Sequence, residues 1–317
     1  MNVAPALLAL IQVMAMIAFT PLLVGIMRQV RSLLEGRVGA GVGQPWRDLR
    51  KLMRKEPLRA PGISWIQAVG PIVLVVSSLI LCALIPLVGT IAFPGLPDDL
   101  FVVVGVLLIG TVALALVGLD AGSAFGGMGS SRHMTIAALV EPTVLVSIYA
   151  LSVPIGSSAL SRIVNQRIAE PATMAAPVSL LAMVSLAIAV VAETSRMPVD
   201  NPSTHLELTM VHEAMILESS GRDLAWLELG SWLRLSAMLG LIGALALPWG
   251  MALEVAPLPL LVGVLTLGLR LAVLAMALAT IEVFLAKLRL FRVPELLAGS
   301  FVLALLAVIT SYLTVTV

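Results

Sequence analysis

Charged residues, aromatic residues and cysteine are scarce in this 317-residue sequence. Charged residues make up 12% and aromatic residues 4%, whereas 60% of the residues are hydrophobic. A soluble domain carries about 25% charged residues, so the composition excludes an ordinary soluble protein. The single cysteine, Cys82, lies in an apolar run and is interpreted as a small buried residue. It cannot form an internal disulfide, and an iron–sulfur cluster needs about four ligands, so any redox centre must lie in a partner.

The motifs of several enzyme classes are missing as well. The sequence has no Ser-His-Asp order, no dinucleotide fingerprint and no thiol pair. The glycine-rich segment after Asp120 lacks the spacing of a phosphate loop, and it predicts a flexible turn or a close backbone approach. His205 and His212, with Glu207 and Glu213 nearby, leave a metal site open only as a minor alternative, because the third ligand is unassigned. We therefore expect no catalytic, cofactor-binding or metal-binding residue in this chain, and no nucleic-acid partner.

Long apolar runs are abundant instead. Continuous runs near 20 residues predict an all-α, polytopic helical membrane protein rather than a barrel, whose strands would alternate. The first run is too long for a signal peptide and is interpreted as a retained span. The eight expected spans cover residues 5–27, 69–91, 101–119, 134–155, 173–192, 230–252, 257–283 and 295–316. Residues 1–317 are treated as one integral membrane domain.

Basic residues are distributed unevenly between the loops. Of the nineteen Lys and Arg residues, all but Arg162, Arg167 and Arg270 follow an odd-numbered span. Cytoplasmic loops carry an excess of Lys and Arg. The loops at about 28–68, 120–133, 193–229 and 284–294 are therefore expected to be cytoplasmic, with both termini on the outer side.

Two of these loops are expected to contain helices. Residues 44–56 begin with Pro45 near the first helical position, stop before Pro57 and place apolar residues on one face. They predict an interfacial amphipathic helix that contributes to a docking surface; a solvated basic loop attracted to anionic lipid is the alternative. Residues 203–218 predict a second helix, with a capping box from Thr204 to Glu207 and a stop at Gly221.

Glu141 is the most informative single residue, because it lies inside the expected span 134–155 and precedes Pro142. A carboxylate at this depth costs ~2.5–3.5 kcal/mol and usually faces a polar interior. Pro142 cannot donate to the carbonyl of Ala138, which opens the backbone locally. Glu141 therefore suits a proton or ion relay; a static, hydrogen-bonded carboxylate near the interface is the alternative.

More acidic residues follow at the end of the fifth expected span. Glu193 lies next to Arg196, which taken alone indicates a surface ion pair. Four more acidic residues follow, and with Glu193 they favour a series of carboxylates that leads toward the interior: Asp200, Glu207, Glu213 and Glu218. Glu282 either extends this run or pairs with Lys287. Arg270, deep in the seventh span, needs an acidic or a carbonyl partner.

Several stretches together resemble a known family. The stretch from Glu193 to Asp200 (ETSRMPVD) and the element from Gly36 to Gly39 (GRVG) resemble loops of the complex I subunit that walls the quinone chamber. Details lie closer to the related formate hydrogenlyase subunit 4 family, which anchors membrane-bound nickel–iron hydrogenases. They are the stretches 129–132 (GSSR), 135–142 (TIAALVEP), 204–209 (THLELT), 212–215 (HEAM) and 288–295 (LRLFRVPE). The chain departs from the family pattern at Ala40, Val199 and His133.

The resemblance implies a non-catalytic anchor subunit of a redox-driven, proton-translocating oxidoreductase complex in a bacterial or archaeal plasma membrane. The implied partners are hydrogenase-like large and small soluble subunits and antiporter-like membrane subunits. Iron–sulfur clusters, with or without a nickel–iron centre, would lie in those partners. The implied proton path consists of Glu141, Glu193, Glu207, Glu213, Glu218 and Glu282. The residues implied in docking and loop geometry are Arg37, Arg132, Arg196 and Asp200.

Three other interpretations stay open. The chain could be the quinone-chamber subunit of an NADH dehydrogenase-like complex, or a passive scaffold without proton traffic. It could also be a stand-alone proton-coupled carrier whose site combines Glu141 with Arg270.

Overall fold

The computed structural model describes residues 4–59, 62–91, 98–200, 210–286, 288 and 292–316. Helices make up its regular structure in these ranges. They are α1 (Ala4–Leu34), α2 (Gln44–Met53), α3 (Ile66–Leu84), α4 (Leu100–Asp120), α5 (Ala124–Ser152), α6 (Leu160–Ala169), α7 (Pro177–Glu193), α8 (His212–Ile216), α9 (Gly221–Ala246), α10 (Pro257–Phe284) and α11 (Val293–Thr316). Two short 3-10 helices, η1 (Val153–Ile155) and η2 (Pro171–Ala175), complete the set among the described residues.

Every expected span coincides with one of these helices. Seven helices of the described chain are long and apolar enough to cross a membrane, and α7 is a shorter apolar helix. The predicted all-α polytopic membrane fold is therefore confirmed. The borders differ most in α5, which begins at Ala124 rather than at 134, and in α9, which begins at Gly221 rather than at 230.

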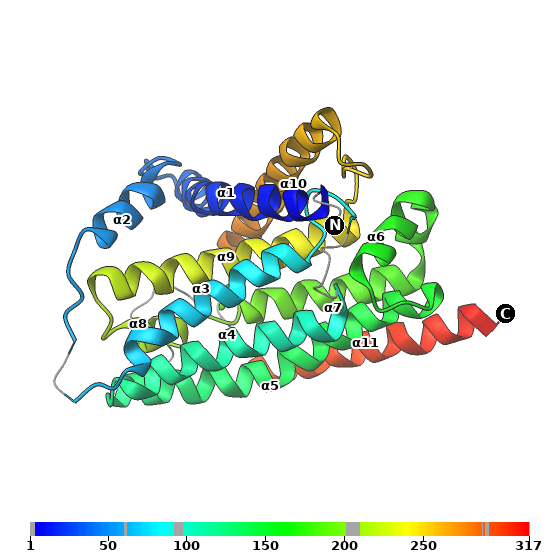
Figure 1. Ribbon diagram of the computed structural model, residues 1–317. Coiled ribbons are helices and arrows are strands. Elements are labelled where there is room, and N and C mark those ends of the chain that lie inside the picture. Colours follow the sequence, from blue (N-terminus) through cyan, green and yellow to red (C-terminus); the bar gives the residue numbers. More distant parts are fainter. Residues whose placement is uncertain are drawn as a thin grey trace.

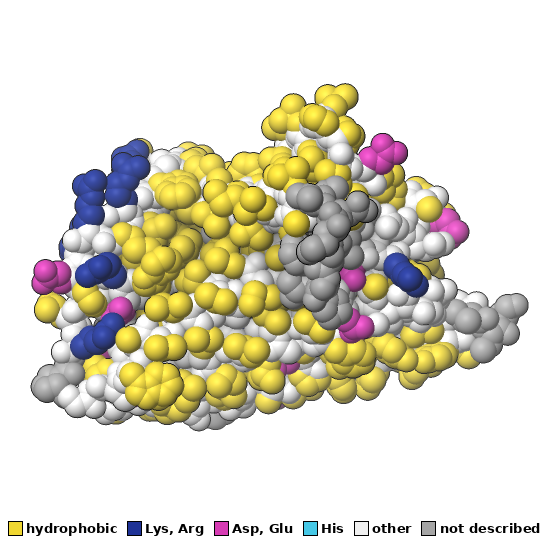
Figure 2. Space-filling model, in the orientation of Figure 1, with side chains coloured by type: hydrophobic (Ala, Val, Ile, Leu, Met, Phe, Trp, Pro, Cys, Tyr) yellow, Lys and Arg dark blue, Asp and Glu magenta, His cyan; other side chains and the backbone are white. Residues whose placement is uncertain are grey.

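The long helices lie side by side in one bundle (Figure 1). Six helices pack on neighbours in the sequence or in space: α3, α4, α5, α7, α9 and α11. Helices α1 and α10 pair with each other and pack against α9. Helices α2 and α8 lie at one end of the bundle, and both termini point toward the other (Figure 1). Figure 2 shows hydrophobic side chains over much of the flank, and most of the visible Lys and Arg side chains at the α2 end.

Helix α2 confirms the predicted loop helix. Pro45 stands in its first turn, and Pro45 and Leu49 are buried where α2 packs against α1 and α9. The chain that follows α2 is tied to the start of α9. The Arg59 guanidinium donates to the Asp223 carboxylate over 2.8 and 3.1 Å. The basic loop that contains α2 and the start of α9 are therefore connected.

The second predicted loop helix, at residues 203–218, was wrong in its described part. Residues 201–209, which carry the expected capping box, lie outside the described chain. From residue 210 onward the helix covers only His212–Ile216. The Asp200 carboxylate accepts the backbone N–H groups of Val211 and His212 at 3.2 Å each. A carboxylate rather than a preceding helical turn satisfies these amides, so α8 starts there.

Two glycines explain the other differences. Gly221, predicted to stop a helix, instead begins α9 with φ +54°, and a Cβ there would lie 2.3 Å from the Glu56 carbonyl oxygen. The glycine-rich segment after Asp120 is helical from Ala124, so the predicted flexible turn was wrong there. The alternative of a close backbone approach is confirmed. A Cβ on Gly126 would lie 2.2 Å from the Gly118 carbonyl oxygen.

Candidate functional site

A cavity of about 500 Å³ runs into the bundle from the end that carries α2 and α8. Its outer wall includes Arg37, whose side chain is 78% exposed, and its inner wall includes Glu193 and Arg234, both 5% exposed as residues. The cavity therefore connects the surface with the interior. Its charged and histidine wall residues are Arg28, Arg31, Arg37, Arg196, Arg234, Glu35, Glu193, Glu213, Glu228, His133 and His212.

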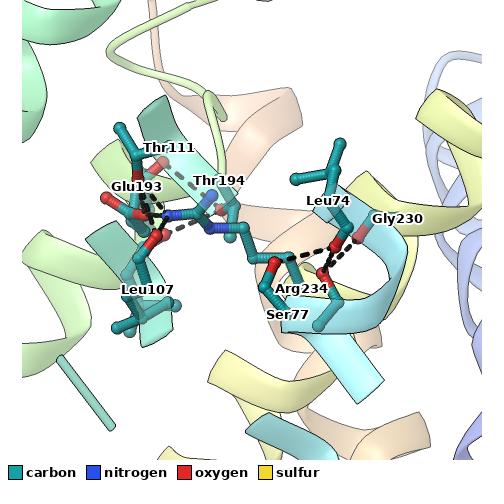
Figure 3. A network of polar contacts seen from close by, with 11 residues as sticks. Leu74, Ser77, Leu107, Thr111, Glu193, Thr194, Gly230 and Arg234 are labelled. Carbon is teal, nitrogen blue, oxygen red and sulfur yellow. Dashed lines mark hydrogen bonds and ion pairs between the residues drawn. The ribbon is translucent and has the colours of Figure 1, made fainter. Parts of the chain in front are cut away.

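A buried ion pair closes the inner end of the cavity. The Arg234 guanidinium on α9 contacts the Glu193 carboxylate at the end of α7 and the Thr111 hydroxyl on α4 (Figure 3). The same nitrogen donates to the carbonyl of Leu107 at 2.9 Å. Because each charge is desolvated, the pair depends on these hydrogen bonds, and removal of either partner would leave an uncompensated buried charge.

Glu141 on α5 adjoins this ion pair. It is 9% exposed, and the charges that act on it most are those of Glu193 and Arg234. The Thr111 hydroxyl lies beside it. A second carboxylate thus lies next to a guanidinium that already binds Glu193, an arrangement in which a proton on one carboxylate would reduce the repulsion between the two.

A third carboxylate, that of Glu282, is buried near the outer end of the cavity. The Glu282 side chain on α10 is 1% exposed; it contacts Arg31 and lies 3.7 Å from Arg196. Both arginines line the cavity, whereas Glu282 lies behind them. The predicted partner Lys287 lies outside the described residues. Glu282 thus ties α10 to the cavity wall through α1 and the loop after α7.

The loop between α7 and α9 holds the other wall. Asp200 is 2% exposed and caps α8, which places His212 and Glu213 in the cavity wall. Arg132 fixes the same loop by donating to the carbonyl of Met210 at 2.9 Å. Burial is the main cause that lowers the pKa of His212 to about 4; Asp200 acts in the opposite direction, and Arg196 and Arg234 add to the lowering. His212 is therefore neutral at pH 7.

The predicted site residues are only partly brought together. Glu193 and Glu213 line the cavity, Glu141 adjoins its inner end, and Glu282 reaches it through arginines. Glu218 is exposed and does not line the cavity, and Glu207 lies outside the described residues. The four docking and loop residues divide evenly. Arg37 and Arg196 line the cavity, whereas Arg132 and Asp200 hold the loop.

Glu193 does not form the surface ion pair with Arg196 that its position next to that residue, taken alone, indicates. Its partner is Arg234, forty-one positions further along the chain, and the pair is buried rather than at the surface. Sequence reasoning counted Arg234 only as a loop cation, although it lies inside the expected span 230–252. A lone charge within a span requires a buried partner, and this signal could have identified it.

Arg270 has carbonyl partners, which decides between the two alternatives that the sequence left open. Its guanidinium donates to the carbonyl of Leu87 at 2.7 Å and, over 3.4 Å, to those of Leu247 and Thr266. The strongest charges near Glu141 are Glu193 and Arg234 instead. Glu141 and Arg270 therefore do not form one site, and the predicted carrier site was wrong.

Comparisons with known proteins agree on a family. A family model described as NADH dehydrogenase matches residues 6–313. Hydrogenase-4 component C of Escherichia coli is 31% identical, covering 94% of this chain and 93% of that protein. Formate hydrogenlyase subunit 4 of the same organism is 30% identical, covering 95% and 97%. An NADH-quinone oxidoreductase subunit of Koribacter versatilis is 28% identical over 62% of this chain and 53% of that protein.

Solved structures agree on the fold. A chain in the structure of the membrane-bound sulfane sulfur reductase, an archaeal respiratory membrane complex, superposes with a TM-score of 0.83. The match covers 97% of this chain and 99% of that one, at 18% sequence identity.

Proposed function

The chain belongs to the NADH dehydrogenase family, which includes complex I subunit 1 and formate hydrogenlyase subunit 4, and we propose that it anchors a redox-driven, proton-translocating membrane complex of the hydrogenase or formate hydrogenlyase type. The relatives that it matches over nearly their whole length are hydrogenase-4 and formate hydrogenlyase subunits. Proteins of those names belong to multisubunit complexes, so this chain acts with partner subunits.

The cavity is the observation that carries the proposal. It joins a basic surface loop to a buried cluster of two carboxylates and one guanidinium. Hydrogenase-like large and small soluble subunits would dock over α2 and the element from Gly36 to Gly39, and they would hold the iron–sulfur clusters and any nickel–iron centre. A change at this docked surface would alter the charge around Arg196 and Glu193, and hence the protonation of Glu141. Protons would leave toward antiporter-like membrane subunits.

The orientation in the membrane follows from the charge distribution. The end that carries α2 would face the cytoplasm of a bacterial or archaeal cell, with both termini outside. The native cysteine is buried, so introduced cysteines can be labelled selectively. A membrane-impermeant maleimide should label Leu58→Cys, which is 78% exposed and lies outside the expected docking element, only from the cytoplasmic side. Arg162→Cys should be labelled only from outside, and the reverse pattern would overturn the orientation.

A quinone chamber is the second candidate. The cavity volume falls within the ~300–1,000 Å³ range of ligand pockets, and apolar side chains such as Val24, Met27, Trp232 and Leu235 share its wall with the charges. The NADH-quinone oxidoreductase relative favours the same interpretation. A complex of this kind would reduce an added quinone and would be inhibited by analogues that compete with it.

The Glu141→Gln variant tests the proposal in the whole complex. The complex is purified in gentle detergent, its subunits are identified by mass spectrometry, and proton movement is followed in vesicles with a pH-sensitive dye. We expect an unchanged subunit composition with cluster-bearing partners and a loss of proton movement per electron transferred. Unchanged pumping would mean a passive scaffold, and a chain that purifies alone would contradict the anchor role.

A further inference from the structure

Three buried polar atoms in the cavity wall have no hydrogen-bond partner within the described part of the chain. They are Nε2 of His133, Oγ of Ser231 and Nε of Arg234. Leaving one buried polar atom unpaired costs about 1–3 kcal/mol. Three such atoms around a single cavity indicate that its contents complete their hydrogen bonds.

The three atoms come from two neighbouring regions of the bundle. Ser231 and Arg234 lie three residues apart on α9, so they share one face of that helix. His133 is 5% exposed on α5, and the charge of Arg234 acts on its ring. The other guanidinium contacts of Arg234 bind it to Glu193, Thr111 and Leu107. Its Nε takes part in none of these contacts, so this nitrogen remains available to the contents of the cavity that Arg234 lines.

The donor set determines what can fill this place. The Nε–H of Arg234 can only donate, whereas the Ser231 hydroxyl and a neutral His133 ring nitrogen can each donate or accept. A charged imidazole beside the Arg234 cation would be unfavourable, so His133 is neutral there. Water can accept from arginine and also donate to histidine, and a cavity of about 500 Å³ with charged groups in its wall has room for it.

We propose that His133, Ser231 and Arg234 form a water-binding subsite at the inner end of the cavity, and that this water passes protons to Glu193. The inference rests on the proposed proton route and assigns the groups that hold its water. In the transfer step the bound water gives one proton to the Glu193 carboxylate. It regains one from the next water toward His212 and Glu213, and that water regains one in turn from the solution at the mouth of the cavity. Each O–H bond that breaks along the chain is matched by one that forms, so one proton moves inward and no electron is transferred.

The His133→Phe variant removes the ring nitrogen while it keeps an aromatic ring in place. In vesicles containing the whole complex, we expect proton translocation per electron to fall about 10²-fold, the lower end of what a positioned proton-transfer group contributes. Ser231→Ala, which removes only a hydroxyl, should reduce it in the same direction. His133→Gln should restore part of the loss, because an amide can donate and accept.

The matched control is Ser236→Ala. Ser236 is buried on the same helix, its hydroxyl donates to the Trp232 carbonyl at 2.9 Å, and it does not line the cavity. It should leave proton translocation unchanged. A fall of the same size in this control would mean a general effect on α9 and would overturn the assignment. If His133→Phe does not assemble, Ser231→Ala compared with Ser236→Ala decides alone.

A second measurement does not depend on turnover. High-resolution cryo-electron microscopy of the complex should show water within hydrogen-bonding distance of the three wall atoms. Lipid or protein density there would overturn the inference. Normal proton translocation in both His133→Phe and Ser231→Ala would also overturn the inference. If Glu141→Gln still uncoupled the complex in that case, the proposed function would survive. Unchanged pumping in Glu141→Gln would instead remove the proposed function itself.

Discussion

The two ends of the bundle bury arginine in different ways. At the end that carries α2 and α8, Arg234 and Arg31 contact the buried carboxylates of Glu193 and Glu282, and both arginines line the cavity. At the end toward which the termini point, Arg270 donates to backbone carbonyls. Both kinds of site satisfy a buried guanidinium, but only the first contains a group that can change its charge.

The carbonyl sites follow from helix geometry. The last carbonyls of a helix have no intrahelical partner and carry the negative end of its dipole. Helix α9 ends at Ala246, and the Arg167 guanidinium contacts the Leu245 carbonyl there while it donates to the Ser179 hydroxyl at 2.6 Å. Arg270 binds in the same way near the ends of α3 and α9. These arginines therefore act as fixed braces, and in the proposed function proton exchange would be confined to the opposite end.

The largest expected effect breaks the pair at the cavity end. Glu193→Ala leaves Arg234 buried without its carboxylate, which should lower the free energy of unfolding by about 3–5 kcal/mol. Replacing both residues, with Glu193→Leu and Arg234→Met, should restore much of this stability because no unpaired charge remains. It should not restore proton movement. Thermal unfolding in detergent and pumping in vesicles measure the two outcomes separately.

Arg270→Met is the matched variant at the other end. It removes hydrogen bonds to carbonyls but leaves no isolated charge behind, so the expected loss of stability is smaller, about 1–3 kcal/mol. Proton movement per electron should stay at the wild-type value. If Arg270→Met uncoupled the complex to the extent expected of Glu193→Ala, the contrast between carbonyl-bound arginines and carboxylate-bound arginines would be wrong.

The sequence was sufficient for the fold at the level of spans. Apolar runs have a length set by the membrane, so each of the eight expected ranges coincides with a helix. It was also sufficient for α2, whose proline and amphipathic pattern act locally. It failed at Gly221 and in the segment after Asp120. The Glu56 carbonyl lies against Gly221, and Ala214 and Val211 lie against Gly129, and contacts between segments so far apart in the sequence leave no local pattern.

The same limit applies to the site. Glu141 was identifiable because a carboxylate within an apolar run must have a polar surrounding. The sequence did not show that Thr111, Glu193 and Arg234 are its neighbours, because these residues come from three different helices. No single-sequence pattern states which helices touch. Whether Glu193 pairs with Arg196 or with Arg234 therefore depends on how α9 packs against α7, and only the structure shows that packing.

The last prediction concerns pH and sharpens the comparison further, because His133 and His212 both line the cavity at one end of the bundle. Burial lowers the pKa of His212 to about 4 in the folded chain, against about 6.5 when unfolded. Between these values the unfolded state binds more protons, so stability is complete above pH 6.5 and falls as the pH drops toward 4. From pH 7 to pH 5 this one group should cost about 2 kcal/mol. His212→Gln removes the titration, so its unfolding temperature in detergent should fall less over that interval than that of the wild type. Equal falls in both proteins would show that the pKa of His212 in the folded chain is close to its unfolded value, and that the wall of the cavity is more hydrated than its burial indicates.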